Sequence, residues 1–329
     1  VDLWNYTAAN HDGGLYSCRV LGKCGGRHLI GWAPRWVDNN VTWMWSNSDF
    51  MSVSNFYTVR GLENLAELAR VAGRANDADK CAKAAADLRS SVVRHMWDPK
   101  HQRFCDGICG DVGGNHSIYS DMYALWLGMV PDESGAADAV WQSMTSWGME
   151  RLGDLGMFVY MKALAAHAAD GGEAAVRALT KCDDDSWCGE IRLRDATMTQ
   201  EKAYSGNGGG GTMSHGWGAS TIAGTVETVV GLRQTAPAFA RFVVKPQLGA
   251  LESVSVKLPT PHGAIWVNAT SSKAAPFVSV DVGVPCNTRA SLCLAVGPET
   301  AGLRLELDGV VPTPANMDCP SLCAALSLC

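Results

Sequence analysis

The chain has 329 residues, of which 47% are hydrophobic, and this is enough apolar material to bury a core and to exclude a disordered chain. Its 27 Lys and Arg residues stand against 33 Asp and Glu residues, a net charge of -6, so no basic excess is present to neutralise phosphates and we expect no nucleic-acid partner. Every apolar stretch is interrupted before the roughly 20 residues that a membrane span needs, so we expect a soluble protein without a membrane partner.

Residues 1–48 are predicted to be a loop-rich N-terminal segment, in which tryptophans crowd together at positions 32, 36, 43 and 45. Over residues 49–236, apolar residues recur at spacings of three and four, which is typical of amphipathic helices. Short polar links between such helices favour antiparallel hairpins packed in a ring or bundle. The first predicted helix stops at Gly73. The others run over Asp77 to Trp97, Tyr119 to Met129, Gly135 to Trp147, Gly156 to Ala169, Glu173 to Leu179 and Trp217 to Leu232.

The apolar pattern changes to period two after Pro237, which indicates short strands between Gly, Pro and Asn turns. We therefore predict a small β-sandwich over residues 237–312, followed by a Cys-rich tail over residues 313–329 to which no fold is assigned. The fold class predicted for the whole chain is mainly α with a β domain. The predicted strands are 242–246, 253–259, 264–268, 277–282 and 303–307.

Twelve cysteines are many for a reducing compartment, and several lie in close pairs. A zinc site would favour CxxC knuckles with His nearby, which the sequence lacks, so we expect disulfides and neither a metal nor another cofactor. We predict that at least four cysteines are paired, foremost Cys105 with Cys109 and Cys286 with Cys293, because each pair would close a short turn. Two further close pairs are Cys182 with Cys188 and Cys319 with Cys323.

Four Asn-x-Ser/Thr triplets, at Asn5, Asn40, Asn115 and Asn268, fit a glycoprotein of the secretory route. The chain begins with Val1 rather than Met and shows no apolar leader, so we expect any signal peptide to have been removed or to lie upstream. We therefore predict a secreted or extracellular protein.

The segment between Glu201 and His215 contains the glycine run 206–211 and is the most unusual part of the sequence. Such a segment is often an ordinary surface loop. Alternatively, Glu201, His215 and Trp217 offer a base, a hydroxyl partner and an apolar stacking face, which are the groups that a sugar site uses.

Inverting glycoside hydrolysis needs two carboxyl groups roughly 6.5–9.5 Å apart, one as general acid and one as general base. Glu201 is a candidate for the base. Each remaining candidate carboxylate also fits a helix cap or a turn, and His215 and the tryptophans also fit a packed core. These carboxylates are Asp38, Asp49, Asp106 and Asp121.

Several motifs together resemble the C-terminal half of the α-L-rhamnosidases of glycoside hydrolase family 78. The most specific is Thr199-Gln200-Glu201 followed by Ser214-His215-Gly216-Trp217-Gly218-Ala219. The similarity covers roughly Leu29 to Pro312. The other matching segments are Gly31 to Asp38, Asn55-Phe56, Phe104 to Gly107, His116-Ser117, Leu127 to Val130, Phe239 to Phe242, Lys245-Pro246 and Pro259 to Gly263.

This resemblance implies an α/α six-hairpin barrel, incomplete in this chain, followed by a β-sandwich. It implies hydrolysis of terminal α-L-rhamnose with inversion, acting on a rhamnose-containing glycoside or polysaccharide. By position, Glu201 would be the general base, His215 and Trp217 would border the sugar pocket, and Trp36 and Asp38 would lie near its mouth. The segment that carries the family's general acid should precede Gly31, and nothing in residues 1–29 matches it, so we expect the acid to lie upstream.

Two other classes of function stay open from the sequence. One is a non-catalytic carbohydrate-binding protein or an inactive fragment of the same fold. The other is a polysaccharide lyase, which would need a Tyr, His or Lys base where the loop offers Glu201. The sequence predicts neither the aglycone nor the oligomeric state.

Overall fold

The computed structural model describes residues 14–15, 28–29, 45–46, 50–111, 116–147, 153–166, 171–183, 186–199, 214–271, 278–295 and 321–327. The chain forms two compact units, Val1–Ala163 and Leu164–Cys329. The described residues include eight α-helices and a set of mainly antiparallel strands, so the expected combination of helices with a β-rich part is present.

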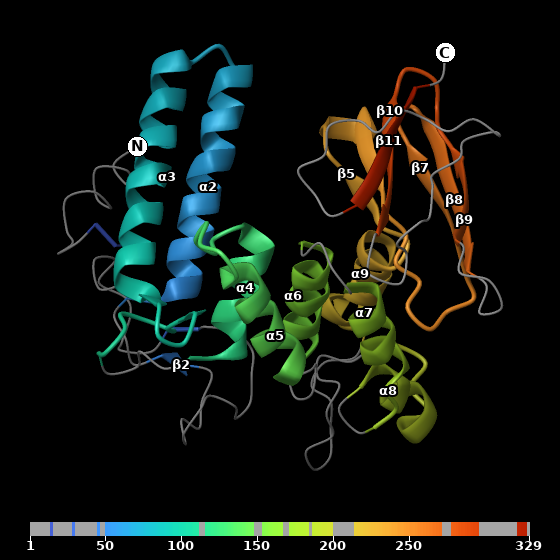
Figure 1. Ribbon diagram of the computed structural model, residues 1–329, viewed down its shortest axis with the longest axis horizontal. Helices are drawn as coiled ribbons and strands as arrows, with labels where there is room; N and C mark the ends of the chain where they lie inside the picture. The colour runs from blue at the N-terminus through green and yellow to red at the C-terminus, as the bar shows by residue number, and fades with distance from the viewer. Residues whose placement is uncertain are drawn as a thin grey trace. The chain divides into compact units, whose positions relative to one another are not determined.

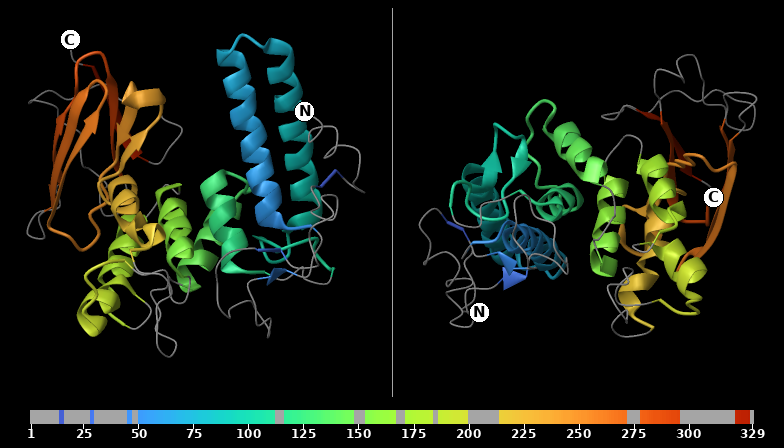
Figure 2. Two further views of the ribbon diagram at one scale, coloured as in Figure 1. Left: turned by 180° about the vertical axis from the view of Figure 1, so that it is seen from behind. Right: turned by 90° about the horizontal axis from the view of Figure 1, so that it is seen from below.

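The longest helices of the first unit are α2 (Ser52–Val71) and α3 (Ala75–Met96), which lie side by side and antiparallel in Figures 1 and 2. Helix α2 buries Phe56 and Val59 on one face, as its apolar spacing predicts. The connection turns at Gly73, whose φ of 72° lies in the left-handed region that glycine adopts most easily. The helix end predicted at Gly73 is therefore confirmed.

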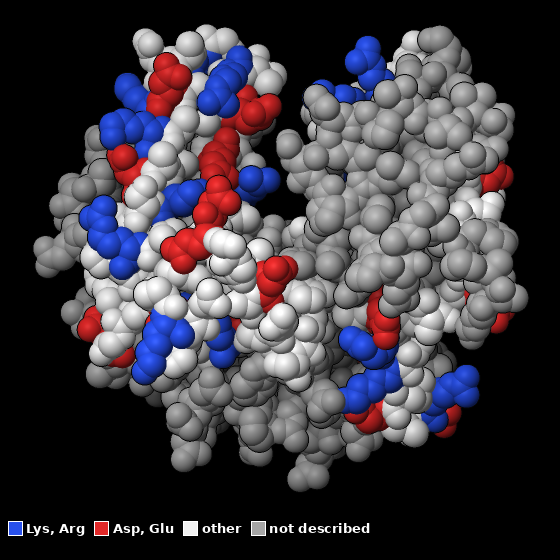
Figure 3. All heavy atoms as spheres, in the orientation of Figure 1, with Lys and Arg blue, Asp and Glu red and all other residues white. Residues whose placement is uncertain are grey.

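Charged side chains of both signs cover the outer surface of this helix pair (Figure 3). Many of them form ion pairs one helical turn apart, such as Arg60 with Glu63 at 3.0 Å and Lys83 with Asp87 at 2.6 Å. Arg89 of α3 reaches across to Glu63 of α2 at 2.6 Å, which links the two helices. These exposed pairs place the charged face toward water and leave the apolar face for packing.

The first unit continues with a short hairpin, two more helices and the larger part of a third. Strands β3 (Trp97–Asp98) and β4 (Arg103–Phe104) pair antiparallel, with Trp97 opposite Phe104. A helix at a surface shows one polar face, whereas helix α4 (Ile118–Leu127) is buried on nearly every side. It is therefore an interior helix of this unit. Two short strands precede α2, namely β1 (His28–Leu29) and β2 (Trp45–Ser46). Two helices follow α4, namely α5 (Ala136–Trp147) and α6 (Gly153–Ala166).

The second unit begins with α7 (Gly171–Thr180) and α8 (Trp187–Arg194). Helix α8 was not expected from the sequence, because its residues have no helical apolar period. It begins at Ser186, whose Oγ accepts a hydrogen bond from the Gly189 N–H at 3.0 Å, and this is an ordinary N-cap contact.

The helix expected from Trp217 to Leu232 is present but ends at Thr228, so the prediction is wrong for its last four residues. A 3-10 turn, η2 (Gly216–Ala219), leads into α9 (Ser220–Thr228), and Leu232 already belongs to strand β5 (Leu232–Gln234). Gly231 has a φ of 70°, which interrupts the helical path between them. The strands therefore begin five residues before the expected boundary at residue 237.

The strands of the second unit form two sheets (Figure 1). One has the order β11-β10-β6-β5, in which β10 pairs parallel with β6 and the other neighbours are antiparallel. The other is an antiparallel meander in the order β7-β8-β9. The remaining elements are η3 (Pro237–Phe239), β6 (Arg241–Val244), β7 (Ser253–Thr260), β8 (Gly263–Ser271), β9 (Val278–Gly283), β10 (Arg289–Ala295) and β11 (Ser321–Ser327).

Apolar side chains from both sheets meet in one core. Phe242 and Leu292 come from the first sheet, and Ile265 and Val267 come from the second. Buried and exposed side chains alternate along β8, as period-two patterning predicts. Strands expected around 242–246, 253–259, 264–268 and 277–282 are therefore present, whereas the one expected at 303–307 lies outside the described residues.

Disulfides join Cys105 to Cys109 and Cys182 to Cys188, and Cys286 and Cys293 are each disulfide-bonded. The expectation of at least four paired cysteines is thus confirmed, including the Cys105 to Cys109 bond. Within the described part of the chain, no helix is both long and apolar enough to cross a membrane.

Candidate functional site

Three of the predicted site residues, Trp36, Asp38 and Glu201, lie outside the described residues. Trp217 is part of η2, where only its backbone is described. His215 is described in full and is partly buried. The geometry of the candidate sugar site can therefore be followed at the two ends of the segment that holds Glu201.

Two hydrogen bonds join the ends of this segment. The His215 N–H donates to the Thr199 carbonyl oxygen at 3.0 Å, and the Thr199 Oγ1 donates to the His215 carbonyl oxygen at 2.8 Å. Ser214 has a φ of 54°, a left-handed conformation that turns the returning chain toward this pair. His215 thus lies beside Thr199, only two residues before Glu201.

The His215 carbonyl oxygen also begins the next element, because it accepts a hydrogen bond from the Gly218 N–H at 3.1 Å in η2. The same oxygen therefore ties together Thr199 at one end of the segment and the turn that carries Trp217. This arrangement fixes the backbone of His215 on both sides.

Two other predicted carboxylate candidates are buried in the first unit. Asp106 is 2% exposed, and its Oδ1 accepts hydrogen bonds from the Ser117 hydroxyl, the Ser117 N–H and the Ser120 hydroxyl. Burial raises the pKa of Asp106 to about 6, although these hydrogen bonds oppose the rise. The serines lie at the start of α4, so Asp106 holds the first turn of that helix.

Asp121 is completely buried within α4 and is paired with Arg103 of β4. The Arg103 Nε donates to Asp121 Oδ2 at 2.9 Å, and the Ser143 hydroxyl of α5 donates to the same oxygen at 2.9 Å. Burial raises the pKa of Asp121 to about 7, against the opposing charge of Arg103. Asp121 therefore joins three elements of the first unit, and both carboxylates fit the structural interpretation.

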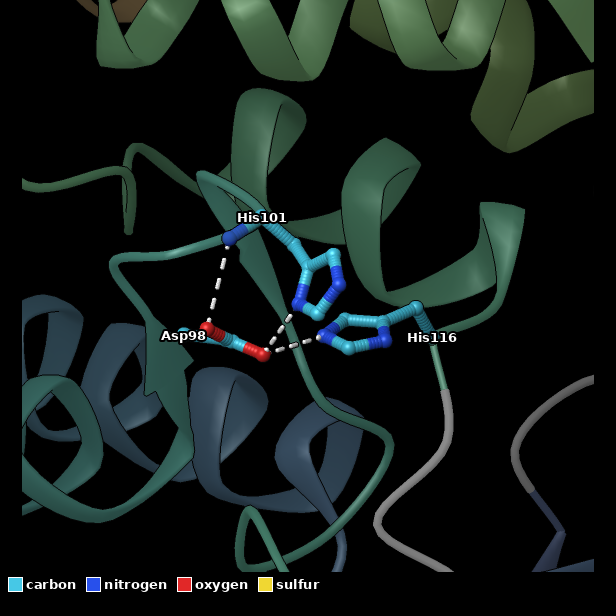
Figure 4. A group of neighbouring side chains, drawn as sticks. All are labelled: Asp98, His101 and His116. Carbon is cyan, nitrogen blue, oxygen red and sulfur yellow. Dashed lines mark hydrogen bonds and ion pairs between the residues drawn. The ribbon is translucent and has the colours of Figure 1, made fainter.

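Sequence reasoning missed a cluster made by Asp98, His101 and His116, whose side chains converge in Figure 4. The His101 Nδ1 lies 2.6 Å from Asp98 Oδ2, and the His116 Nε2 lies 3.2 Å from the same oxygen. Burial raises the pKa of Asp98, but hydrogen bonds from His101 and from two backbone N–H groups outweigh this and hold it below its usual range. Burial and the Arg103 charge lower the pKa of His116.

Two parts of the sequence match models of known protein families. Residues 33–155 match the mannosylglycerate hydrolase MGH1-like glycoside hydrolase domain. Residues 231–304 match the bacterial α-L-rhamnosidase C-terminal domain. No curated protein matches the sequence.

Solved structures of three α-L-rhamnosidases resemble the fold. The enzyme from Dictyoglumus thermophilum matches with a TM-score of 0.65 and 17% identity, over 80% of this chain and 29% of that protein. The family 78 enzyme of Bacillus sp. GL1 matches with a TM-score of 0.64 and 20% identity, over 88% of this chain and 30% of that protein. The Streptomyces avermitilis enzyme, solved in complex with L-rhamnose, matches with a TM-score of 0.64 and 17% identity, over 97% of this chain and 29% of that protein.

The chain thus spans less than a third of the length of these enzymes, while most of its own residues superpose on them. Residues 33–155, which include helices α2 to α5, match a glycoside hydrolase domain, and residues 231–304, which include most of the strands, match a rhamnosidase C-terminal domain. In its sequence domains and in its fold, the chain resembles the α-L-rhamnosidases of glycoside hydrolase family 78.

Proposed function

We propose that this chain is the C-terminal, catalytic-type part of a glycoside hydrolase that removes terminal α-L-rhamnose with inversion from a glycoside or polysaccharide. The proposal includes an α/α six-hairpin barrel, incomplete in this chain, followed by a β-sandwich that begins with β5 at Leu232. The observation that supports it is the pair of hydrogen bonds between Thr199 and His215, because they hold the backbone of a candidate sugar-binding residue next to Thr199, two residues before Glu201.

In the proposed mechanism, Glu201 is the general base. Its carboxylate would take a proton from the water that attacks the anomeric carbon from the face opposite the leaving group. His215 and Trp217 would bind the sugar, the imidazole through a hydroxyl group and the indole through the apolar face of the ring. Trp36 and Asp38 would lie near the mouth of the pocket.

The general acid is proposed to come from a part of the protein that precedes this chain. Asp106 and Asp121 are poor candidates, because both are buried and each already accepts hydrogen bonds from neighbouring side chains. The related enzymes are about three times as long as the matched region, so they have room for such a segment. Without an acid the sugar oxygen departs unprotonated, which costs about 10²–10⁴-fold in rate.

We further propose that the protein is a secreted glycoprotein. The described part of the chain contains six disulfide-bonded cysteines, and disulfides persist in oxidising compartments. The four glycosylation triplets are consistent with the same route.

The test compares Glu201→Gln with the unchanged protein, both with the upstream region present, on an aryl α-L-rhamnoside. The glutamine keeps the shape of the side chain but cannot accept the proton, so kcat should fall by at least about 10²-fold while rhamnose binding survives. Glu252→Gln is the matched control, because Glu252 is an exposed glutamate of the second unit and should leave both quantities unchanged.

His215→Ala should weaken rhamnose binding and turnover together, because a hydroxyl partner acts in the ground state and in the transition state. Near-full turnover in Glu201→Gln would overturn the assignment of the base. Rhamnose binding without any hydrolysis by the protein that includes the upstream region would instead favour a carbohydrate-binding protein. Robust hydrolysis by the 329 residues alone would overturn the proposal of an upstream acid.

A further inference from the structure

The cluster of Asp98, His101 and His116 brings together side chains from two segments of the first unit. Asp98 ends β3, His101 follows in the turn of the hairpin, and His116 lies two residues before α4. Figure 4 shows both imidazole rings directed at the same carboxylate, with their ring centres 4.9 Å apart. One ligand atom from each of the three residues lies within 4.8 Å of the other two.

Backbone N–H groups of the hairpin turn hold the Asp98 carboxylate in place. Asp98 Oδ1 accepts hydrogen bonds from the Lys100 N–H at 2.9 Å and the His101 N–H at 3.3 Å. These contacts orient the group and leave Oδ2 to face the two imidazoles. Such support from surrounding hydrogen bonds is typical of carboxylates that bind metal ions.

The distances suit a small tetrahedral ion. Zinc binds imidazole nitrogen and carboxylate oxygen at about 2.0–2.2 Å, so neighbouring ligand atoms should lie about 3.3 Å apart. The His116 Nε2 is already 3.2 Å from Asp98 Oδ2, and the His101 Nδ1, at 2.6 Å, needs to move back by less than about 1 Å. The His101 side chain is 53% exposed, which allows this movement and gives an ion access from solvent.

We propose that Asp98 Oδ2, His101 Nδ1 and His116 Nε2 form a binding site for a divalent transition-metal ion of the zinc class. Two nitrogens and one oxygen match the ligand preference of this class, whereas Ca²⁺ and Mg²⁺ prefer oxygen. The Cys105 sulfur lies 3.6 Å from the His116 Nε2, but it is bonded to Cys109 and supplies no thiolate. The fourth position of a tetrahedral ion is therefore left to water.

A bound ion would join the β3–β4 hairpin to the residues that lead into α4. Within the cluster, these two segments now share the contact between His116 Nε2 and Asp98 Oδ2 at 3.2 Å. The ion would therefore stabilise the first unit, and this role is independent of the proposed rhamnosidase activity.

The test measures Zn²⁺ binding to the oxidised protein by competition with a chromophoric zinc chelator. We expect one bound ion that depends on this cluster, and His101→Ala and His116→Ala should each weaken its affinity by at least about tenfold. His262→Ala is the matched control, since His262 is an exposed histidine in a hairpin turn of the second unit and should change nothing. A hundredfold excess of Ca²⁺ should not displace the ion.

Thermal unfolding supplies a second measurement, because Zn²⁺ should raise Tm in the unchanged protein and in His262→Ala but not in His101→Ala. His101 is exposed, so its replacement should leave the far-UV circular dichroism spectrum intact. Zinc binding that is unchanged in both cluster variants, or no binding at micromolar zinc, would overturn the proposal. Displacement of the ion by Ca²⁺ would overturn the assignment to the zinc class.

Discussion

The start of helix α4 and the core between the two sheets bury their residues in different ways. Around α4 the buried groups include two carboxylates, Asp106 and Asp121, together with serine hydroxyls that hydrogen-bond to them. Between the sheets, eight buried apolar side chains pack together in one cluster. They are Val230, Leu232, Phe242, Val244, Ile265, Val267, Ala290 and Leu292.

The difference lies in what each core demands of its residues. Apolar side chains gain from burial in proportion to their area, so similar shapes can replace one another at small cost. A buried carboxylate needs a particular partner at a particular atom, and loss of that partner leaves a desolvated charge. We therefore expect the α4 region to be sensitive to the chemistry of a substitution and the sheet core to its volume.

The largest effect should follow Arg103→Met, which removes the cation that pairs with Asp121 at 2.9 Å. Breaking a buried ion pair from one side costs about 3–5 kcal/mol in the free energy of unfolding. Burial raises the pKa of Asp121 to about 7, so the carboxyl can take up a proton at pH 5 and the loss should be smaller there than at pH 8. Urea denaturation at both pH values measures this.

The control is Arg74→Met, which removes a cation from the exposed pair with Asp77. Exposed pairs contribute about 0–1 kcal/mol, so this variant should unfold almost like the unchanged protein. Equal losses for the two arginine variants would remove the distinction between the buried and exposed pairs. A loss for Arg103→Met that does not depend on pH would remove the role given to Asp121.

A second test concerns the pH dependence caused by Asp106. Burial raises its pKa from 3.8 to about 6, so between these values the folded chain holds a proton that the unfolded chain has released. The stability contributed by this group is therefore present below pH 4 and is lost as pH rises through 6. Asp106→Asn does not titrate, so its stability relative to the unchanged protein should rise by up to about 3 kcal/mol between pH 4 and pH 8.

Asp87→Asn is the control for this pH series, because Asp87 is an exposed carboxylate of α3. Its stability relative to the unchanged protein should stay nearly constant over the same range. If Asp106→Asn also follows the unchanged protein in parallel from pH 4 to pH 8, burial of the Asp106 carboxyl does not govern the pH dependence.

The smallest effect is expected in the sheet core, with Ile265→Val. This change deletes one buried methyl group and should cost about 0.5–1.5 kcal/mol, independent of pH. Urea denaturation again provides the measurement. A loss as large as that of Arg103→Met would mean that the sheet core depends on shape as strictly as the α4 region depends on charge.

Much of the fold could be predicted from periodicity. The end of α2 at Gly73 and the strands β7 and β8 follow from local spacing, because one face of each element is buried. Helix α8 could not be found this way, although Ser186 followed by Gly189 fits an N-cap signal. The helix predicted up to Leu232 ends at Thr228 instead, because the buried Val229, Val230 and Leu232 continue the apolar pattern of α9 although Leu232 belongs to β5.

The candidate site was predictable only in part. The residues around Glu201 and His215 are predicted from composition and from the resemblance. The structure describes the contact between Thr199 and His215, whereas Glu201 lies outside the described residues, so its role stays a prediction. The cluster of Asp98, His101 and His116 could not be predicted, because His116 approaches from outside the hairpin and no knuckle spacing marks it. Contacts between distant loops depend on the packing of the helices that carry them.

The parallel pairing of β10 with β6 also bears on how the protein is synthesised. The β7–β8–β9 meander pairs neighbouring segments, and it can form as soon as those residues leave the ribosome. Strand β6 must wait for Arg289, which pairs with Arg241 about 48 residues earlier. At translation rates of about 5–20 residues per second, the edge of β6 that pairs with β10 has no partner for roughly 2 to 10 s during synthesis. Nascent chains held near one another on a polysome would meet through this edge, so its exposure is the step at which a chaperone would help most.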